Sequence, residues 1–346
     1  MLNKSLRDLV NNDVDTLRYN MDQGIFIFNK KDVIKALDHE VRSSRKNVLN
    51  ELHDEHNFKY YAIIKPTIFK SLDRLAQKFA NFSKVIDLCK TRLTLFSLVS
   101  PKMISLPPIL LTGEPGVGKT RFIKELAKLF NTDFYSLDFS TISSGFVLNG
   151  GDSTWSESKP GFVSNSLRDS RYANPIILLD EIDKVGNDKI YDPLACLYSL
   201  LEPHSAANFR DEFLEITMDM SKILWFATAN YPKRIPAPIR SRMTQIHIDP
   251  PTHEHSKNIT HSIYKELLDS HAWGKHFSKK LSLEVINLLT ILPARDVLKA
   301  LENALANAAN RAKNNSFRIK IIVSDFGDVH ALKKQSKKGI GFLAEL

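Results

Sequence analysis

Residues 109–122 read ILLTGEPGVGKTRF, and this stretch decides the fold. A short apolar run, typical of a buried strand, leads into a turn from Gly113 to Thr120 that fits the spacing G-x-x-x-x-G-K-[ST], and a helical pattern follows. Glycines let successive backbone N–H groups surround a phosphate, and the helix N-terminus adds its dipole. An ordinary glycine turn before a helix would not require Lys119 and Thr120 at its end. The stretch therefore predicts a nucleoside triphosphate site, in which Lys119 reaches the β- and γ-phosphates and the Thr120 hydroxyl ligates Mg²⁺.

Two carboxylates follow a second apolar run, IILLDE at residues 176–181. A buried strand that ends in Asp180 and Glu181 places both at the carboxyl edge of the sheet, where ligands bind in such folds. We expect Asp180 to hold the metal, usually through water, and Glu181 to activate the attacking water. Taken alone, the pattern also fits a strand that ends in solvated acids. Its position after the phosphate-binding turn favours the hydrolytic role.

A third apolar run, KILWFATAN, ends in Asn230. An amide beside the other two strand ends can orient the lytic water, although a polar residue that merely ends a strand is the alternative. The three apolar runs alternate with helical stretches such as TRFIKELAKLF and LACLYSLLE. Fully apolar strands separated by helices predict a parallel sheet that is covered on both faces.

Three arginines are candidates for stabilising charge on the transferred phosphoryl group. Arg240 and Arg242 lie in IPAPIRSRM, after a proline-stiffened turn and with no evident acidic partner in the sequence. Supplied across a subunit boundary, such an arginine raises the rate by roughly 10³–10⁵ where this has been measured. Arg295, in LPARDVL, opens a helix from which it could reach the γ-phosphate of its own subunit. The alternatives are a solvated basic turn and a surface arginine.

The bulk composition fits a globular protein of two or three domains, with 346 residues, 43% hydrophobic and 25% charged. No apolar run approaches the length of a membrane span. The two cysteines lack metal-ligand spacing, so we expect free thiols in a reducing cytoplasm. The net charge of +9 is concentrated at the ends, with 18 Lys and Arg against 12 Asp and Glu in residues 1–105 and 8 against 3 in residues 310–346. This fits a solvated basic surface, or else a contact with nucleic acid.

The flanking regions are mainly helical in pattern. GIFIFN, residues 24–29, predicts a short strand, and Asn29 is placed to cap one long helix over residues 30–52. Helical spacing recurs after Pro66 and from Val85 to Leu98, and SPKMISLPP then interrupts it. From residue 253 the pattern is again mostly helical, with a late strand expected at FRIKIIV, residues 317–323.

Taken in order, these motifs resemble the AAA+ ATPases. Within them RYANPIILLDEIDKV, IPAPIRSRM and the long phrase from Asp192 to Asn230 are most similar to the ATPase module of Lon-type proteases, over about residues 106–335. The resemblance implies an α/β fold: a P-loop AAA+ parallel sheet with helices on both faces, preceded by a mainly helical N-terminal segment and followed by a helical lid. It also implies ATP and Mg²⁺ at the subunit boundaries of a homo-oligomeric ring, commonly a hexamer.

Site roles follow from the resemblance residue by residue. Asn230 matches the sensor, Arg242 (with Arg240 beside it) the arginine finger, and Arg295 the second sensor. The residues expected to contact the nucleotide are Gly113, Glu114, Pro115, Gly116, Val117, Gly118, Lys119, Thr120, Arg121, Asp180 and Arg295. We expect a recognition or bracing region at 1–105, the ATPase domain at 106–252, and the lid with a short basic tail at 253–346.

Trp155, in DSTWSESKPGF, falls where Lon-type ATPases carry the pore loop, whose aromatic residue grips threaded polypeptide. Glu157 and Lys159 make this loop more polar than the family's. Trp155 is therefore expected to contact polypeptide; nucleic acid in the channel, or packing of Trp155 against a neighbouring subunit, are the alternatives.

The chain ends at KKGIGFLAEL, near where the Ser/Lys protease domain of the family begins. We therefore expect a cytoplasmic motor that remodels or threads protein without proteolysis of its own. A nucleic-acid-associated ATPase and an ATP-gated scaffold are the alternatives.

Overall fold

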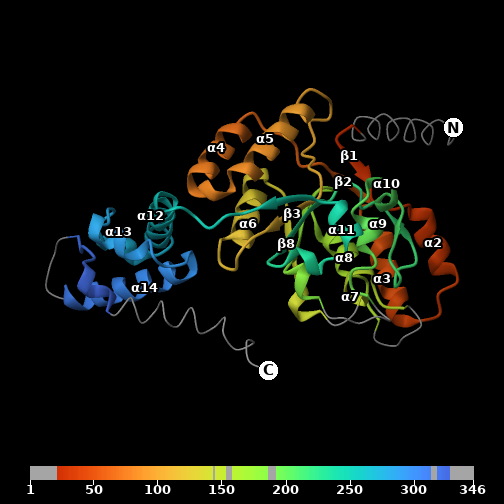
Figure 1. Cartoon of the computed structure of the whole chain (residues 1–346). Helices are drawn as coiled ribbons and strands as arrows, with labels where there is room; N and C mark the ends of the chain where they lie inside the picture. The colour runs from red at the N-terminus through yellow and green to blue at the C-terminus, as the bar shows by residue number, and fades with distance from the viewer. Residues whose placement is uncertain (1–21, 143–144, 153–157, 186–191, 313–317, 328–346) are drawn as a thin grey trace, which may run out of the picture. The chain divides into compact units, whose positions relative to one another are not determined.

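The computed structural model describes residues 22–142, 145–152, 158–185, 192–312 and 318–327 (Figure 1). These residues divide into two compact units. Unit 1 contains the described residues up to Leu72, together with Lys84–Gly113 and Thr120–His247. Unit 2 contains Asp73–Ser83, Glu114–Lys119 and the described residues from Ile248 onward. Within the described residues, no helix is long and apolar enough to cross a membrane.

Unit 1 is built on a five-stranded parallel sheet of order β4-β5-β8-β3-β9, with helices on both sides. Its strands are β3 (Ile109–Thr112), β4 (Phe134–Asp138), β5 (Ile176–Asp180), β8 (Leu224–Ala229) and β9 (Thr244–His247). The three central strands are almost entirely buried because helices cover both of their faces, which explains their uninterrupted apolar sequences. The three predicted strands are confirmed. The edge strands β4 and β9 are less buried, and their mixed sequences give a weaker strand signal.

The helices of unit 1 include the predicted α6, which begins directly after the phosphate-binding turn. Their bounds are α6 (Lys119–Phe130), α7 (Phe146–Asn149), α8 (Phe162–Asp169), α9 (Leu197–Leu200), α10 (Pro203–Ala206) and α11 (Ala237–Ser241). Short 3₁₀ turns occur in both units at η1 (Ala80–Phe82), η2 (Phe139–Thr141), η3 (Ile182–Lys184), η4 (Pro232–Arg234), η5 (Ala272–His276) and η6 (Val323–Phe326). The helix predicted over LACLYSLLE is only four residues long, because Pro203 begins a new helix at α10.

The N-terminal segment shares the core of unit 1. A two-stranded antiparallel sheet pairs β1 (Gly24–Phe26) with β2 (Phe58–Tyr60), and the helices α2 (Lys30–Asp38) and α3 (Ser43–Asp54) lie between them in sequence. Ile27, Val33 and Leu49 belong to the same hydrophobic cluster as the sheet residues Leu110 and Ile177. These contacts fix α2 and α3 to the five-stranded sheet.

The prediction of one long helix over residues 30–52 is wrong. Asn29 does cap α2, since its side chain accepts the Lys31 N–H at 2.9 Å. The helix ends at Asp38, and the chain turns through Glu40, whose buried carboxylate accepts the Arg42 backbone N–H at 2.8 Å. This local bond competes with continuation of the helix.

A second antiparallel pair, β6 (Phe209–Arg210) with β7 (Thr217–Met218), precedes β8. Its turn spans residues 211–216, and Phe28 forms an isolated bridge to Met218. The helices α4 (Ile68–Lys78) and α5 (Ser83–Phe96) match the two predicted helical stretches, and no helix continues through SPKMISLPP.

In unit 2, three helices pack around a core that includes Ile263, Val285, Leu301 and Phe326. They are α12 (His253–Asp269), α13 (Leu283–Leu289) and α14 (Ala294–Arg311). The late strand expected at FRIKIIV is wrong for its described residues: Ile319 forms only an isolated bridge to Phe277, and η6 begins at Val323. Asp325 draws the chain into this turn, since its carboxylate accepts the Ile322 N–H and pairs with Arg311.

Candidate active site

The glycine-rich turn of residues 113–118, predicted to bind phosphate, has a backbone that requires glycine. Gly116 and Gly118 adopt φ values of +86° and +98°. A Cβ placed on Gly116 would meet nothing within 4 Å, so glycine is required there by backbone conformation and not by crowding. Lys119 is buried at the start of α6, and its Nζ donates to the Glu114 carbonyl at 3.1 Å. The ammonium is thus folded back over the turn that precedes it.

Thr120 and Asp180 are brought together as predicted. The Thr120 hydroxyl lies 2.9 Å from Asp180 Oδ2 and 3.2 Å from Oδ1, and it donates to this carboxylate. Asp180 is the last residue of β5, and Thr120 is in the first turn of α6. Hydroxyl and carboxylate oxygens are the hard donors that Mg²⁺ prefers, so this pair fits a magnesium ion.

Thr228 on β8 joins Asp180 to Glu181, and sequence reasoning missed it. Its hydroxyl donates to Asp180 Oδ1 and accepts the Glu181 backbone N–H at 2.9 Å. A hydroxyl in a strand that is otherwise apolar, ILWFATA, was the available signal. Thr228 is 1% exposed, so both of its bonds are shielded from water. It therefore fixes the junction between the two acids.

Glu181 has a strained backbone and a side chain that faces outward. Its φ of +54° is uncommon for a residue with a Cβ, and such conformations cluster at functional sites. Its carboxylate pairs with Lys184 Nζ at 2.7 Å and is one-third exposed. The hydrogen bond that Lys184 donates to Glu181 raises the pKa of Lys184. The candidate base is therefore accessible and ion-paired.

Asn230 directly follows β8 and is half-buried. A second residue that the sequence argument missed, Asp183, holds its backbone: Asp183 Oδ2 accepts the N–H groups of Asn230 at 3.1 Å and of Tyr231 at 2.8 Å. Asp183 is 4% exposed, and it lies three residues after Asp180 in LDEID. It connects the end of β8 to the 3₁₀ turn that follows Glu181.

Arg242 has an acidic partner, which corrects the expectation from sequence. Its Nε lies 2.7 Å from Glu202 Oε1, its Nη1 donates to the Pro238 carbonyl at 2.8 Å, and its guanidinium lies 5.7 Å from the centre of the Tyr198 ring. Glu202 follows α9, forty residues earlier, so the pairing depends on the fold. Arg240 instead donates from Nε to the Ile235 carbonyl at 3.1 Å within its own turn.

Arg295 and Trp155 are the two remaining candidates. Arg295 is exposed in the first turn of α14, in unit 2. Trp155 lies outside the described residues. The two ends of its loop are described: the Gly151 N–H donates to the Lys159 carbonyl at 3.2 Å, and Ser158 donates to the Asp152 carbonyl at 2.6 Å.

Comparison with known proteins agrees with this geometry. Residues 109–250 match the family described as ATPase family associated with various cellular activities (AAA). The chain is 33% identical to the Lon protease of Halothermothrix orenii over 188 residues, which are 53% of this chain and 24% of that protein. It is 32% identical to the Lon protease of Clostridioides difficile over 216 residues, 62% of this chain and 27% of that protein.

A human protein, the mitochondrial Lon protease homolog, is 35% identical over 136 residues, 39% of this chain and 14% of that protein. The matched part is thus no more than 27% of the length of these relatives. The resemblance inferred from the motifs is confirmed over this part. Residues 109–250 therefore match the AAA family model, and the chain is similar over this part to the corresponding part of Lon proteases.

Proposed function

We propose that this chain is a Mg²⁺-dependent ATPase that assembles into a ring, with a hexamer as the expected form, and uses ATP hydrolysis to thread or remodel polypeptide. The observation that carries the proposal is the convergence of Thr120, Asp180, Thr228 and the Glu181 backbone at the carboxyl edge of the central strands. This edge is where parallel sheets bind their ligands. The AAA match supports hydrolysis, and the names of the Lon relatives support a polypeptide substrate.

The chain's own residues divide the chemistry among them. Thr120 and Asp180 would hold Mg²⁺, which when bound neutralises charge on the phosphates. Lys119 and the backbone of the Gly113–Gly118 turn bind the phosphates. Glu181 takes the proton of the attacking water, and Asn230 orients that water. Thr228 keeps the two acids at a fixed separation.

Arg242 completes the site of a neighbouring subunit in this proposal. Its guanidinium is partly exposed, and it is already oriented by Glu202 and Tyr198. Arg240 is the second basic residue of that turn, and Arg295 links the position of α14 to the nucleotide. These roles divide the chain into an ATPase domain at 106–252, a lid at 253–346, and a recognition or bracing region at 1–105.

Phosphoryl transfer, and not peptide cleavage, is the chemistry that this cluster supplies, so we propose a motor without its own proteolysis. A reducing cytoplasmic location belongs to the same proposal. Burial raises the pKa of the thiols of Cys89 and Cys196 to about 12, which keeps both protonated, and both are free. Protonated thiols are poor nucleophiles and resist oxidation.

The test is steady-state ATP hydrolysis by purified protein with and without Mg²⁺, and with Glu181→Gln as a blank that still binds nucleotide. Mixing Glu181→Gln with Arg242→Ala tests the ring: each variant alone should be inactive, and the mixture should regain activity. In a mixed ring, an Arg242→Ala subunit keeps its own Glu181, and a neighbouring Glu181→Gln subunit supplies the missing arginine to that site. No recovery in mixed oligomers would contradict a shared site.

The substrate is tested by adding unfolded polypeptide, or single- and double-stranded DNA, and by following peptide cleavage in parallel. Stimulation by polypeptide that is lost in Trp155→Ala, without cleavage, supports the proposal. Stimulation by DNA alone would mean that the motor acts on nucleic acid. Peptide cleavage that depends on ATP would mean that the protein is a protease.

A further inference from the structure

The turn of residues 211–216, between β6 and β7, lies between two parts of unit 1. On one side it contacts both ends of the loop 150–161, which carries Trp155. On the other side it contacts the N-terminal helix α3. Every contact described below is within unit 1.

Asp211 binds the loop side, and it is fully buried. Its Oδ2 accepts the Gly161 N–H at 2.8 Å, and its Oδ1 accepts the N–H groups of Phe213 and Leu214 at 2.9 Å each. Burial raises the pKa of Asp211, and these backbone N–H groups oppose that rise. One carboxylate therefore ties its own turn to the C-terminal end of the loop.

The N-terminal end of the loop contacts the same turn. The Glu212 N–H donates to the Asn149 carbonyl at 2.9 Å, and the Asn149 amide donates to Glu212 Oε1 at 2.7 Å. Gly150 has a φ of +91°, and a Cβ there would lie 2.7 Å from Asp211 Oδ1. The base of the loop is thus packed directly against Asp211, with no room for a side chain.

Arg45 of α3 binds the opposite side of the turn. Its Nε donates to the Phe213 carbonyl at 2.8 Å, and its Nη2 donates to the Leu214 carbonyl at 2.7 Å. Its Nη1 pairs with the buried Glu40, whose pKa the hydrogen bonds from Arg42 and Arg45 lower to about 2. The carbonyls of Phe213 and Leu214 thus accept hydrogen bonds from Arg45, and their N–H groups donate to Asp211.

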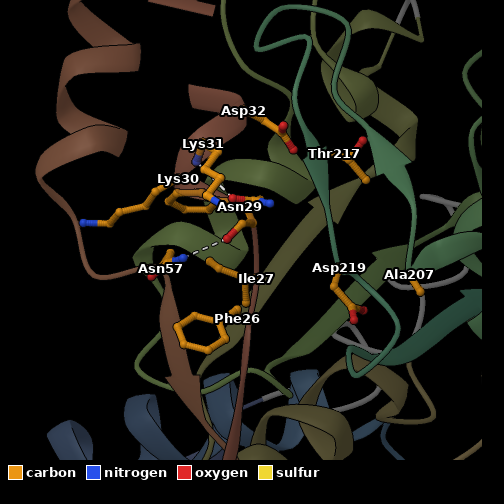
Figure 2. Close-up of a pocket in the computed structure, with 11 residues that line it drawn as sticks. Phe26, Ile27, Asn29, Lys30, Lys31, Asp32, Asn57, Ala207, Thr217 and Asp219 are labelled. Atoms are coloured by element: carbon orange, nitrogen blue, oxygen red, sulfur yellow. Dashed lines mark hydrogen bonds between the residues drawn. The ribbon is translucent and has the colours of Figure 1, made fainter. Parts of the chain in front are cut away.

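The N-terminal segment is also joined to the hairpin by its backbone. The Asp219 N–H donates to the Ile27 carbonyl at 2.8 Å, beside the bridge from Phe28 to Met218. Figure 2 shows the cavity of about 640 Å³ next to this join, with Asp32 of α2 and Thr217 of β7 among its lining residues. The N-terminal segment and the hairpin are therefore connected at two places, through Arg45 and through Ile27 with Phe28.

We propose that Asp211 is a positioning residue for the two described ends of this loop, residues 150–152 and 158–161, and that Arg45 couples the N-terminal helices to these ends. In this assignment the N-terminal region braces the loop that contacts substrate. Only the substrate role of the loop depends on the proposed function, because the brace itself consists of described contacts.

Hydrogen exchange of the wild type and variants tests the brace without any activity. In the wild type the two oxygens of Asp211 accept three backbone N–H groups. Asp211→Asn keeps only one acceptor oxygen, so the Gly161 and Gly151 amides should exchange about tenfold faster. Arg45→Met should do the same. Arg45→Met removes one of the two arginines that pair with the buried Glu40. The double variant Glu40→Gln/Arg45→Met therefore provides a charge-balanced version if the single variant unfolds.

Matched controls are Asp133→Asn and Arg171→Met, since Asp133 and Arg171 form an ion pair elsewhere in unit 1. They should leave exchange at 151 and 161 unchanged. Unchanged exchange in the Asp211 and Arg45 variants, or equal acceleration in the controls, would overturn the brace.

Polypeptide-stimulated ATP hydrolysis then tests the positioning role. Asp211→Asn should keep basal turnover within about twofold and lower stimulation about tenfold. The double variant Asp211→Asn/Trp155→Ala should be no worse than Trp155→Ala alone, because both changes act on one loop. Additive losses, or an equal fall in basal turnover, would refute positioning. If wild-type protein shows no stimulation, the proposed substrate fails while the exchange result still decides the brace.

Discussion

The hydroxyl of Thr228 donates to the carboxylate of Asp180 from the adjacent strand of the sheet. The same oxygen accepts the backbone N–H of Glu181, so one buried hydroxyl spans the two acids. Thr120 reaches Asp180 from the other direction. Asp180 therefore lies between two hydroxyls, one on a helix and one on a strand, and its orientation is set by both.

Thr228→Val should lower ATP turnover and the apparent affinity for Mg²⁺ by about 10–100-fold. This is the usual cost of losing a group that orients a metal ligand. The shape of the side chain is kept, so the sheet should remain intact. The measurement is kcat against Mg²⁺ concentration. Thr132→Val is the control, because it removes a buried hydroxyl that donates to the Asn174 carbonyl at 3.0 Å. It should cost about 1 kcal/mol of stability with kcat unchanged. Equal kinetic losses in both variants would argue against a specific role for Thr228.

Glu202→Gln should lower turnover less than about fivefold. The side chain of Glu202 is 47% exposed, and an exposed ion pair such as the one it forms with Arg242 is worth about 0–1 kcal/mol. Arg242→Ala should cost about 10³-fold or more if its guanidinium acts on the phosphoryl group. Steady-state kcat of the two variants at one protein concentration makes the comparison. A loss in Glu202→Gln as large as that in Arg242→Ala would mean that Glu202 itself takes part in hydrolysis.

Glu40, which accepts hydrogen bonds from Arg42 and Arg45, should make unfolding depend on acid pH. The pKa of Glu40 in the folded protein is about 2, below its ordinary value of 4.5, so ionisation is favoured by folding. Its contribution to stability is fully present above pH 4.5, and it is lost as the pH falls through about 2. The free energy of unfolding, measured by denaturant between pH 5 and about pH 2.5, should fall more steeply in wild type than in Glu40→Gln/Arg45→Met. Parallel curves would contradict the assignment.

Gly116→Ala should weaken ATP binding about tenfold or more, through backbone strain alone. With φ at +86° and open space around the added methyl group, the cost is about 1–2 kcal/mol for a left-handed residue. The nucleotide Kd and the melting temperature without nucleotide separate binding from folding. Lys233→Ala, on an exposed turn, is a control that should leave both values unchanged. Wild-type affinity in Gly116→Ala would show that nucleotide binding does not need this backbone.

Local patterns were sufficient for the central strands and for α6. A strand that helices cover on both faces is apolar throughout, so it can be predicted from its own residues alone, as at β3, β5 and β8. Helical periodicity alone did not predict the break between α2 and α3, because Glu40 turns the chain by binding Arg42 and Arg45. The apolar residues of FRIKIIV predicted a strand, whereas Asp325 draws the backbone into a turn.

The sequence by itself determined the glycine-rich turn before α6, the two acids at the end of β5 and the resemblance of residues 109–250 to the AAA family, because each depends on contiguous motifs and their spacing. Only the tertiary structure decided that Thr228 bridges those acids, that Glu202 pairs with Arg242, and that Arg45 and Asp211 hold opposite sides of one turn. The partners that join Thr228 to Asp180, Glu202 to Arg242 and Arg45 to the turn are 40 to 169 residues apart in the sequence. A single hydroxyl or carboxylate carries no periodic signal, and its partner is set by which strands and helices pack together.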